Sequence, residues 1–357
     1  MLQPSRSAAT AEELESFYQD LKPNSLGALW TVQERALVDE PKSQAQAHLW
    51  PWRELRPRAM KAAALVGTQD AERRVLMLLN PGLDGRIATT NSLFSGIQIV
   101  MPGEAARAHR HTPAALRFII ESAGGYTTVE GDKVPMRPGD LVLTPNWTWH
   151  DHGNETSKPM IWLDCLDAPL VGYLDAMLQE PFYENPQPVT LPVGYTNSRI
   201  GGGLMRGIQD NAVSKPLPIT YKWPDAYGAL GESGAETPFD GVAMEYINPL
   251  NGGHTMPTIS CRLQQIRPDE HTGTHRHTGN TVYHAAAGKG FSVINGTRVD
   301  WEKGDTFVLP PLAWHEHGNE SPQDAVLFSM SDAPVLEALQ LYREEEGSRQ
   351  EVVGVLD

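Results

Sequence analysis

Short runs of apolar residues, interrupted at regular intervals, dominate the chain from Arg73 onward. Strand-like runs are expected at 74–79, 93–100, 115–121, 125–130, 141–144 and 159–166. Glycine, proline and aspartate separate these runs at the spacing typical of a β-sandwich or β-barrel. Residues 242–334 repeat the same pattern of short strands. The alternation therefore predicts a mostly β protein with two similar β regions.

Helical patterns lie outside these β regions. Residues 11–21 combine one apolar face with Thr10 as a candidate N-cap and acidic residues in the first turn, as expected at the start of a helix. Further helices are expected at 52–66 and at 334–346. The cluster Trp50-Pro51-Trp52 predicts an arm that packs either on its own barrel or on another subunit, and the pattern favours neither.

The pattern divides the chain of 357 residues into four parts. Residues 1–72 form a helical arm, 73–185 the first β domain, 186–240 a connection rich in glycine and proline, and 241–357 the second β domain with a C-terminal helix. The length suits two domains of ordinary size. A connection this long is expected to pack on the surface instead of swinging freely.

Composition narrows the classes of partner. The net charge of −15 argues against nucleic acid or an anionic membrane as a partner, because both repel an acidic surface. The two cysteines, Cys165 and Cys261, form neither a disulfide framework nor a zinc ribbon. The N-terminal residues lack a signal-peptide pattern, and no apolar run approaches a membrane span. These features predict a cytoplasmic protein.

Two histidine clusters occur in the first β domain. His109 and His111 are two residues apart, so a strand would direct both imidazoles to the same face. His150 follows the strand-like run 140–145. If these strands are neighbours in a barrel, the three imidazoles converge on one point. Three neutral imidazoles suit Fe, Zn, Cu or Ni better than Mg or Ca.

The whole pattern occurs a second time. His275, His277 and His315 repeat the triad, again with a Gly-Asp turn and a proline before the third histidine. The second and third histidines are separated by 39 positions in the first copy and 38 in the second. Repetition at this period predicts two copies of one domain, not a solenoid of short repeats.

With both patterns laid out, the chain resembles the gentisate 1,2-dioxygenase group of bicupins, which includes salicylate and 1-hydroxy-2-naphthoate dioxygenases. The resemblance extends from Trp30 to about Tyr342. It implies two tandem antiparallel β-barrels of the jelly-roll type, with peripheral N- and C-terminal helices. It is carried by His109-Arg110-His111, Leu116-Arg117-Phe118, Met136-Arg137-Pro138-Gly139-Asp140, Trp149-His150-Asp151-His152-Gly153-Asn154 and Asp164-Cys165-Leu166-Asp167.

The resemblance implies an enzyme that uses non-haem Fe(II) and O2 to open an aromatic ring between its carboxyl- and hydroxyl-bearing carbons. Gentisate would give maleylpyruvate. Salicylate, 5-nitrosalicylate, 5-halosalicylates and 1-hydroxy-2-naphthoate are the alternative substrates. The resemblance also implies a homotetramer whose assembly involves the N-terminal arm.

One iron per chain is expected in the first barrel, on His109, His111 and His150. Many cupins add a glutamate ligand four or five residues after the second histidine, where this chain has Ala115 and Leu116. Three neutral ligands would leave the double charge of Fe(II) uncompensated. That charge suits a substrate that chelates through its carboxylate and adjacent phenol oxygen.

Two arginines are candidates for binding the substrate carboxylate. Arg117 is six positions after His111, hence on the same face of a regular strand, and its planar fork suits a carboxylate. The alternative for Arg117 is a surface salt bridge. Arg73 matches a family pocket residue, and because neighbours on a strand face opposite ways, only one of Arg73 and Arg74 is expected inside.

The resemblance assigns four further residues. Gln98 matches a pocket residue that hydrogen-bonds the substrate. Phe94 stands where relatives are expected to have tyrosine or tryptophan, so a polar tip that a 5-hydroxyl could bond is missing. His152 is expected to act as an acid/base or substrate contact, together with Asp164. The alternative for Asp164 is a strand-end carboxylate that orients a neighbour.

The second copy keeps the histidines but changes their surroundings. Arg117 aligns with Tyr283 and Asp164 with Ser329, so His275, His277 and His315 form a candidate second metal site that lacks the residues expected to bind a substrate carboxylate.

Two other classes of protein compete with a ring-cleaving enzyme. A cupin isomerase or oxalate-type enzyme, which would use Mn, usually keeps the glutamate ligand, and a non-enzymatic bicupin has no need of the histidines and the arginine.

Overall fold

The structure is a computed structural model that describes residues 9–67, 71, 73–184, 186–200, 220–232, 234 and 236–356. By its internal contacts the chain divides into two units, Met1–Lys42 and Ser43–Asp357. Among the helices in the described part of the chain, none has the length and apolar character needed to cross a bilayer.

The N-terminal unit is helical, as its sequence predicts. It contains α1 (Ala11–Leu21), α2 (Gln33–Ala36) and two short 3-10 turns, Lys22–Asn24 and Leu29–Thr31. A capping box begins α1, because the Thr10 side chain accepts from the Glu13 amide and the Glu13 carboxylate accepts from the Thr10 amide. Leu14 and Phe17 on the apolar face of α1 are exposed.

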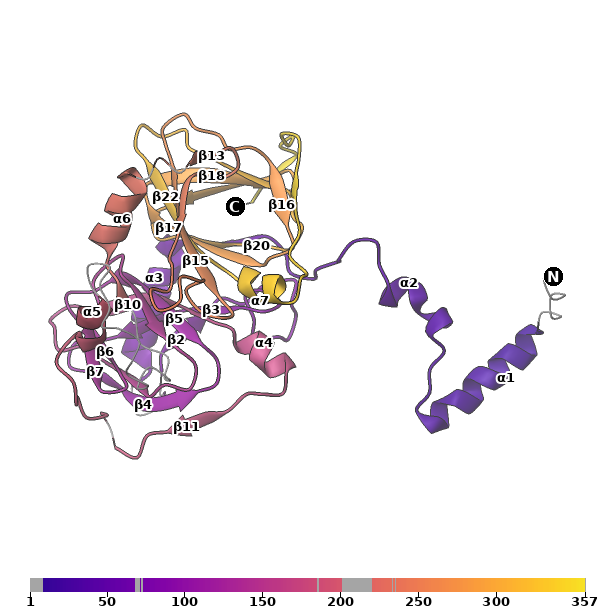
Figure 1. The fold of residues 1–357 in the computed structure, drawn as a ribbon, viewed down its shortest axis with the longest axis horizontal. Coiled ribbons are helices and arrows are strands. Elements are labelled where there is room, and N and C mark those ends of the chain that lie inside the picture. The colour runs from indigo at the N-terminus through magenta and orange to yellow at the C-terminus, as the bar shows by residue number, and fades with distance from the viewer. Residues whose placement is uncertain are drawn as a thin grey trace. The chain divides into compact units, whose positions relative to one another are not determined.

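The first barrel of the larger unit consists of two sheets, drawn mostly in magenta in Figure 1. The strands are hydrogen-bonded in the order β12-β8-β5-β10-β3-β2 in one sheet and β11-β4-β9-β6-β7 in the other. The first sheet contains β2 (Val75–Met77), β3 (Phe94–Val100), β5 (Ala115–Glu121), β8 (Leu141–Thr144), β10 (Met160–Leu166) and β12 (Thr220–Tyr221). The second contains β4 (Ala105–His111), β6 (Tyr126–Val129), β7 (Asp132–Pro135), β9 (His150–Gly153) and β11 (Gln179–Pro181).

The second barrel repeats this architecture with sheets ordered β1-β20-β17-β22-β15-β14-β13 and β23-β16-β21-β18-β19-β24. The first of these sheets contains β1 (His48–Trp50), β13 (Glu236–Thr237), β14 (Gly241–Glu245), β15 (Ser260–Ile266), β17 (Thr281–Ala287), β20 (Thr306–Leu309) and β22 (Ala325–Ser331). The other contains β16 (His275–His277), β18 (Lys289–Ile294), β19 (Thr297–Glu302), β21 (His315–Gly318), β23 (Glu344–Glu346) and β24 (Gly354–Leu356). The prediction of a mostly β, two-barrel fold is confirmed.

Each barrel has an edge strand that comes from the segment preceding the other barrel in the chain. Strand β1 precedes the first barrel but pairs with β20 of the second, and β12 precedes the second barrel but pairs with β8 of the first. The Trp50–Trp52 cluster therefore packs on the second barrel of the same chain. Strand β12 belongs to the predicted 186–240 connection, so this described part of the connection lies on the first barrel, whereas residues 201–219 lie outside the described residues.

A helix follows each exchanged strand, and each helix is anchored on the barrel that its strand joins. The Trp52 amide, at the start of α3 (Trp52–Leu65), donates to Asp305, and the Trp223 amide, at the start of α6 (Trp223–Glu232), donates to Asp140. The Gly-Asp turns must approach these tryptophans closely. A Cβ at Gly139 would lie 2.5 Å from the Trp223 ring, and Gly139 also has φ +84°, where glycine is favoured.

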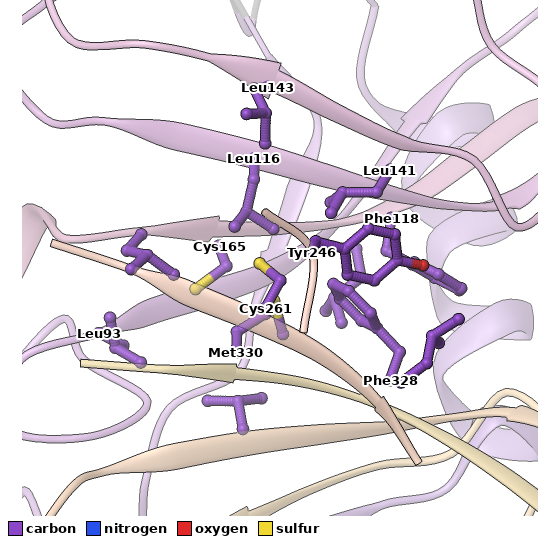
Figure 2. Close-up of a cluster of buried hydrophobic side chains, with 14 of the residues drawn as sticks. Leu93, Leu116, Phe118, Leu141, Leu143, Cys165, Tyr246, Cys261, Phe328 and Met330 are labelled. Atoms are coloured by element: carbon purple, nitrogen blue, oxygen red, sulfur yellow. The ribbon is translucent and has the colours of Figure 1, made fainter. Parts of the chain in front are cut away.

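A continuous apolar core joins the two barrels (Figure 2). Phe118 of β5 stacks on Phe328 of β22, with ring centroids 4.3 Å apart. Figure 2 shows Cys165 and Cys261 in the same core, and both thiols are free and buried. Because this core is shared, the barrels are expected to unfold together.

Three short helices complete the described fold: α4 (Ala168–Tyr173), α5 (Tyr195–Ile200) and α7 (Ala333–Ala338).

The prediction of a helix over 334–346 is wrong in its extent, because α7 ends at Ala338. Gln340 adopts φ +60° and the Leu341 amide returns to the Leu336 carbonyl, a left-handed ending that stops a helix. Residues Glu344–Glu346 then form β23, which pairs with the histidine strand β16. The predicted domain limits at 72, 185 and 240 stay predictions.

The anchoring of α3 predicts a measurable stability loss. Asp305 is 3% exposed and accepts from the amides of Trp52 and Glu302. Asp305→Ala leaves both donors without their acceptor, which should cost about 1–3 kcal/mol of unfolding free energy and lower the melting temperature. Asp84→Ala, at an exposed position, is the control and should melt with the unchanged protein. Equal melting of both variants would contradict the anchoring.

Candidate metal centre

The first histidine triad comes together where β4 pairs with β9. His109 lies directly opposite His150 in this pairing, and a β-bulge between Ala106 and His109 shifts the register. The ring centroids of His109, His111 and His150 are 4.6–5.3 Å apart. One donor atom from each histidine lies within 4.8 Å of the others, which is the convergence that the spacing predicts.

Backbone acceptors orient two of these rings. Nδ1 of His111 lies 2.8 Å from the Pro113 carbonyl, and Nδ1 of His150 lies 3.0 Å from the Thr148 carbonyl. Because a carbonyl can only accept, Nδ1 carries the proton and Nε2 keeps its lone pair for a metal. Nε2 of His150 is buried and has no hydrogen-bond partner in the described structure, as expected for a nitrogen whose lone pair serves a metal.

Burial keeps the imidazoles neutral. It lowers the pKa of His109 to about 2 and that of His111 to about 4, and the positive charge of Arg73 adds to both shifts. Burial also holds the pKa of His150 well below its ordinary value. Neutral imidazole is the form that coordinates metals, so the triad is ready to act as a nitrogen ligand set.

Arg117 and Asp164 form a buried ion pair at the edge of the triad. They lie opposite each other across β5 and β10, with Nε of Arg117 3.5 Å from Oδ1 of Asp164. The indole of Trp162 donates to the same carboxylate oxygen at 2.8 Å, and Arg117 also donates to the Thr144 hydroxyl. Burial raises the pKa of Asp164, and the Arg117 charge opposes that shift. The alternative of a surface salt bridge is therefore wrong for Arg117, which is 2% exposed.

The structure distinguishes Arg73 from Arg74. Nη2 of Arg73 lies 2.9 Å from Nε2 of His109, whereas the Arg74 side chain, also just before β2, points away from the histidines. Arg74 donates to the carbonyls of Ala63 and Val66 and forms an ion pair with Glu104. Arg74 therefore ties the C-terminal end of α3 to the barrel, and Arg73 faces the histidines.

A cavity of about 280 Å³ lies over the triad, between the two sheets of the first barrel. Its polar wall includes Arg73, Gln98, Arg117 and Asp164, and its apolar wall includes Val75, Phe94, Ala115 and Leu166. Gln179, on the edge strand β11, completes the lining. Every predicted substrate-binding residue reaches this cavity, and Asp164 does as well.

Several residues around the cavity were not predicted from the sequence. Trp162 was detectable, because it lies two positions before Asp164 on one strand face. Thr144 and Gln179 gave no local signal, because only strand pairing brings them to the site: Thr144 lies opposite Ala115, and Gln179 lies opposite His111.

His152 lies deeper in the barrel than its predicted role as a substrate contact requires. It is fully buried, and the cavity lining does not include it. Its ring centroid is 5.0 Å from that of Trp162 and 5.9 Å from that of His150. His152 thus packs beside His150, which lines the cavity, and against Trp162, and its acid/base role stays a prediction.

The rings of the second triad are spaced less evenly than those of the first. His275 lies opposite His315 across β16 and β21, and the centroid distances are 5.9 Å for His275–His277, 5.1 Å for His277–His315 and 4.2 Å for His275–His315. Among the residues with described positions, only the first triad brings one possible ligand atom from each of its three histidines within 4.8 Å of the others. Tyr283 and Ser329 face each other in the register of Arg117 and Asp164, as the alignment of the two copies predicts.

Known proteins resemble this chain over nearly its whole length. The family described as Cupin domain matches residues 96–166 and 262–331. The chain is 40% identical to 5-aminosalicylate 1,2-dioxygenase of Comamonas sp., over 97% of this chain and 94% of the relative. It is 38% identical to gentisate 1,2-dioxygenase 1 of Aquipseudomonas alcaligenes, over 94% and 97%. The salicylate 1,2-dioxygenase of Pseudoaminobacter salicylatoxidans, solved as an adduct with gentisate, superposes with a TM-score of 0.87 at 34% identity, covering 98% of both chains.

The buried ion pair generates a stability prediction that is independent of activity. Asp164→Ala leaves the Arg117 charge buried without its partner, which should cost about 3–5 kcal/mol of unfolding free energy. Adding Arg117→Leu removes that charge, so the double variant should recover much of the loss. Urea unfolding of the two variants measures the difference. A double variant less stable than Asp164→Ala alone would contradict the charge-burial argument.

Proposed function

Because this chain belongs to the family of gentisate and salicylate 1,2-dioxygenases, we propose that its first barrel opens the ring of a salicylate-type acid. Family membership makes the protein a ring-cleaving dioxygenase with two cupin domains. The proposed reaction uses Fe(II) and O2 and cleaves between the carboxyl-bearing and hydroxyl-bearing carbons. An isomerase, an oxalate-type enzyme and a storage protein are not supported by these relatives.

The observation that carries the proposal is the arrangement of three neutral imidazoles beside two guanidinium groups. His109, His111 and His150 offer nitrogen ligands without a carboxylate in the triad, a set that suits Fe(II). Iron bound there would supply Lewis-acid positions for the substrate oxygens and the redox chemistry needed to activate O2. Arg73 and Arg117 lie in the same cavity, where they can bind the substrate carboxylate.

The protein's own residues divide the work of positioning the substrate. The fork of Arg117 can pair with both carboxylate oxygens, and Asp164 and Thr144 hold that fork in place. Gln98 offers a hydrogen-bonding amide on the same cavity wall. Val75, Phe94 and Leu166 form an apolar surface for the ring and displace water from it. His152 and Asp164 are the proposed groups for proton movement. His152 would act from its buried position beside His150.

The substrate class follows from the apolar side of the cavity. Phe94 presents an unsubstituted ring, so it offers no hydrogen bond to a 5-hydroxyl. Gentisate and 5-substituted salicylates, including amino, nitro and halogen forms, are the proposed substrates, with salicylate and 1-hydroxy-2-naphthoate as alternatives. The 40% identity to a 5-aminosalicylate 1,2-dioxygenase supports a salicylate with a substituent at position 5. The proposed homotetramer and cytoplasmic location stay predictions from the sequence.

Removal of one ligand tests the assignment of the first barrel. Protein loaded with Fe(II) should consume O2 in the presence of gentisate or a 5-substituted salicylate. His150→Ala should abolish this uptake and lower the iron content while circular dichroism stays unchanged. His48→Ala, on the edge strand β1, is the control and should retain iron and turnover. Full O2 uptake by His150→Ala would rule out the first barrel as the catalytic centre.

Substitution of Arg117 tests carboxylate binding. Arg117→Ala should cost about 2–5 kcal/mol of transition-state stabilisation, the loss typical of truncating one partner of a buried charge pair. Arg117→Lys should rescue poorly, because an ammonium cannot form the two parallel bonds of a guanidinium.

Arg74→Lys is the matched control for this experiment. Arg74 is also buried beside a carboxylate but faces away from the cavity, so its replacement should leave the ratio kcat/KM near that of the unchanged protein. If Arg117→Lys and Arg74→Lys give the same kcat/KM, Arg117 supports the fold and does not bind the substrate.

A further inference from the structure

The cavity of the second barrel has the opposite electrostatic character to that of the first. It measures about 130 Å³, and its lining includes three carboxylates, Asp240, Glu245 and Glu344, against one guanidinium, that of Arg262. The first cavity contains two guanidinium groups, those of Arg73 and Arg117, against the one carboxylate of Asp164. An aromatic acid anion is therefore repelled by the second cavity, whereas a cation is attracted to it.

Glu344 is placed to orient the first histidine of the second triad. It lies on β23, opposite His277 of β16. In the first barrel the corresponding position, opposite His111, is Gln179 of β11. Its Oε1 is 2.9 Å from Nδ1 of His275. Because a carboxylate can only accept, Nδ1 of His275 carries the proton and Nε2 carries the lone pair.

The other two rings have the same tautomer for the same reason. Nδ1 of His277 lies 3.1 Å from the Gly279 carbonyl, and Nδ1 of His315 lies 3.0 Å from the Ala313 carbonyl. Nε2 of His275 and Nε2 of His315 are buried and have no hydrogen-bond partner in the described structure. His275 is 3% exposed and His315 is fully buried. A buried lone pair without a donor is costly unless a ligand uses it.

We propose that the second barrel binds a divalent transition-metal cation through His275, His277 and His315, with Glu344 orienting His275, and that this cation stabilises the barrel without serving ring cleavage. A carboxylate that accepts from the distal nitrogen of a ligating histidine is a common support of metal sites, because it fixes the ring and raises its basicity. Imidazole ligands select Zn²⁺, Fe²⁺, Cu²⁺ or Ni²⁺ over Mg²⁺ and Ca²⁺.

The uneven spacing of this triad bears on its affinity. The His275 and His277 rings are 5.9 Å apart, against 5.3 Å for His109 and His111, whereas His275 and His315 are 4.2 Å apart, against 4.6 Å for His109 and His150. In the described residues the ligand atoms converge within 4.8 Å only in the first triad, so binding in the second requires its rings to rearrange. The second site is therefore the weaker of the two. Its filling should raise the melting temperature, because a ligand that binds only the folded state stabilises that state.

The test isolates the second site by disabling the first. The full chain with His109→Ala and His111→Ala is titrated with Zn²⁺ alone, and bound metal is measured by calorimetry and by metal analysis after dialysis. We expect about one Zn²⁺ per chain and a higher melting temperature. Adding His275→Ala and His277→Ala should remove both effects. Equal Zn²⁺ binding by the double and quadruple variants would overturn the proposal.

A pair of variants on β23 tests Glu344 and does not depend on whether the quadruple variant folds. In the background without the first site, Glu344→Gln should weaken Zn²⁺ binding by about 10- to 100-fold. Glu345→Gln is the matched control, because Glu345 pairs with Arg276 and is not part of the cavity lining. Equal affinity in the two variants would refute the role of Glu344. No measurement here involves turnover, so its outcome is separate from that of the proposed ring cleavage.

Discussion

The pairing of one histidine strand with another is the interaction on which both sites depend. In the first barrel β4 and β9 bring His109 opposite His150, and in the second β16 and β21 bring His275 opposite His315. Residues two apart on a strand share a face, so these pairings also bring in His111 and His277. The backbone then fixes the rings, since Nδ1 of the second and third histidine of each triad lies near a backbone carbonyl.

Around this shared frame the two barrels differ in charge. The first pairs Arg117 with Asp164 across β5 and β10, and the second places Tyr283 opposite Ser329 in the same register. On the edge strand next to the triad, the first barrel has Gln179 and the second has Glu344. A few substitutions thus change a cavity that attracts anions into one that attracts cations, while the strands that support it stay the same. This difference in charge supports the proposed assignment of ring cleavage to the first barrel.

The two barrels are joined so closely that neither is complete without the other. Strands β1 and β12 each extend a sheet of the opposite barrel, and α3 and α6 each start on its Gly-Asp turn. The apolar core that contains Phe118 and Phe328 is continuous between them. A rigid support of this kind suits a site whose ligands must keep a fixed geometry, because sites built on strands are held more accurately than sites on loops.

The sequence by itself determined the two-barrel fold, the histidine triads and the family, because these rest on local alternation and on a repeat that is visible along the chain. It also predicted that Arg73 and Arg74 face opposite ways. Only the tertiary structure decided that Arg73 is the one inside, that α7 ends early, and that Gln179 and Glu344 reach the cavities. These facts depend on pairing between residues far apart in the chain, and the register of such pairing is set by burial and packing that no local pattern contains.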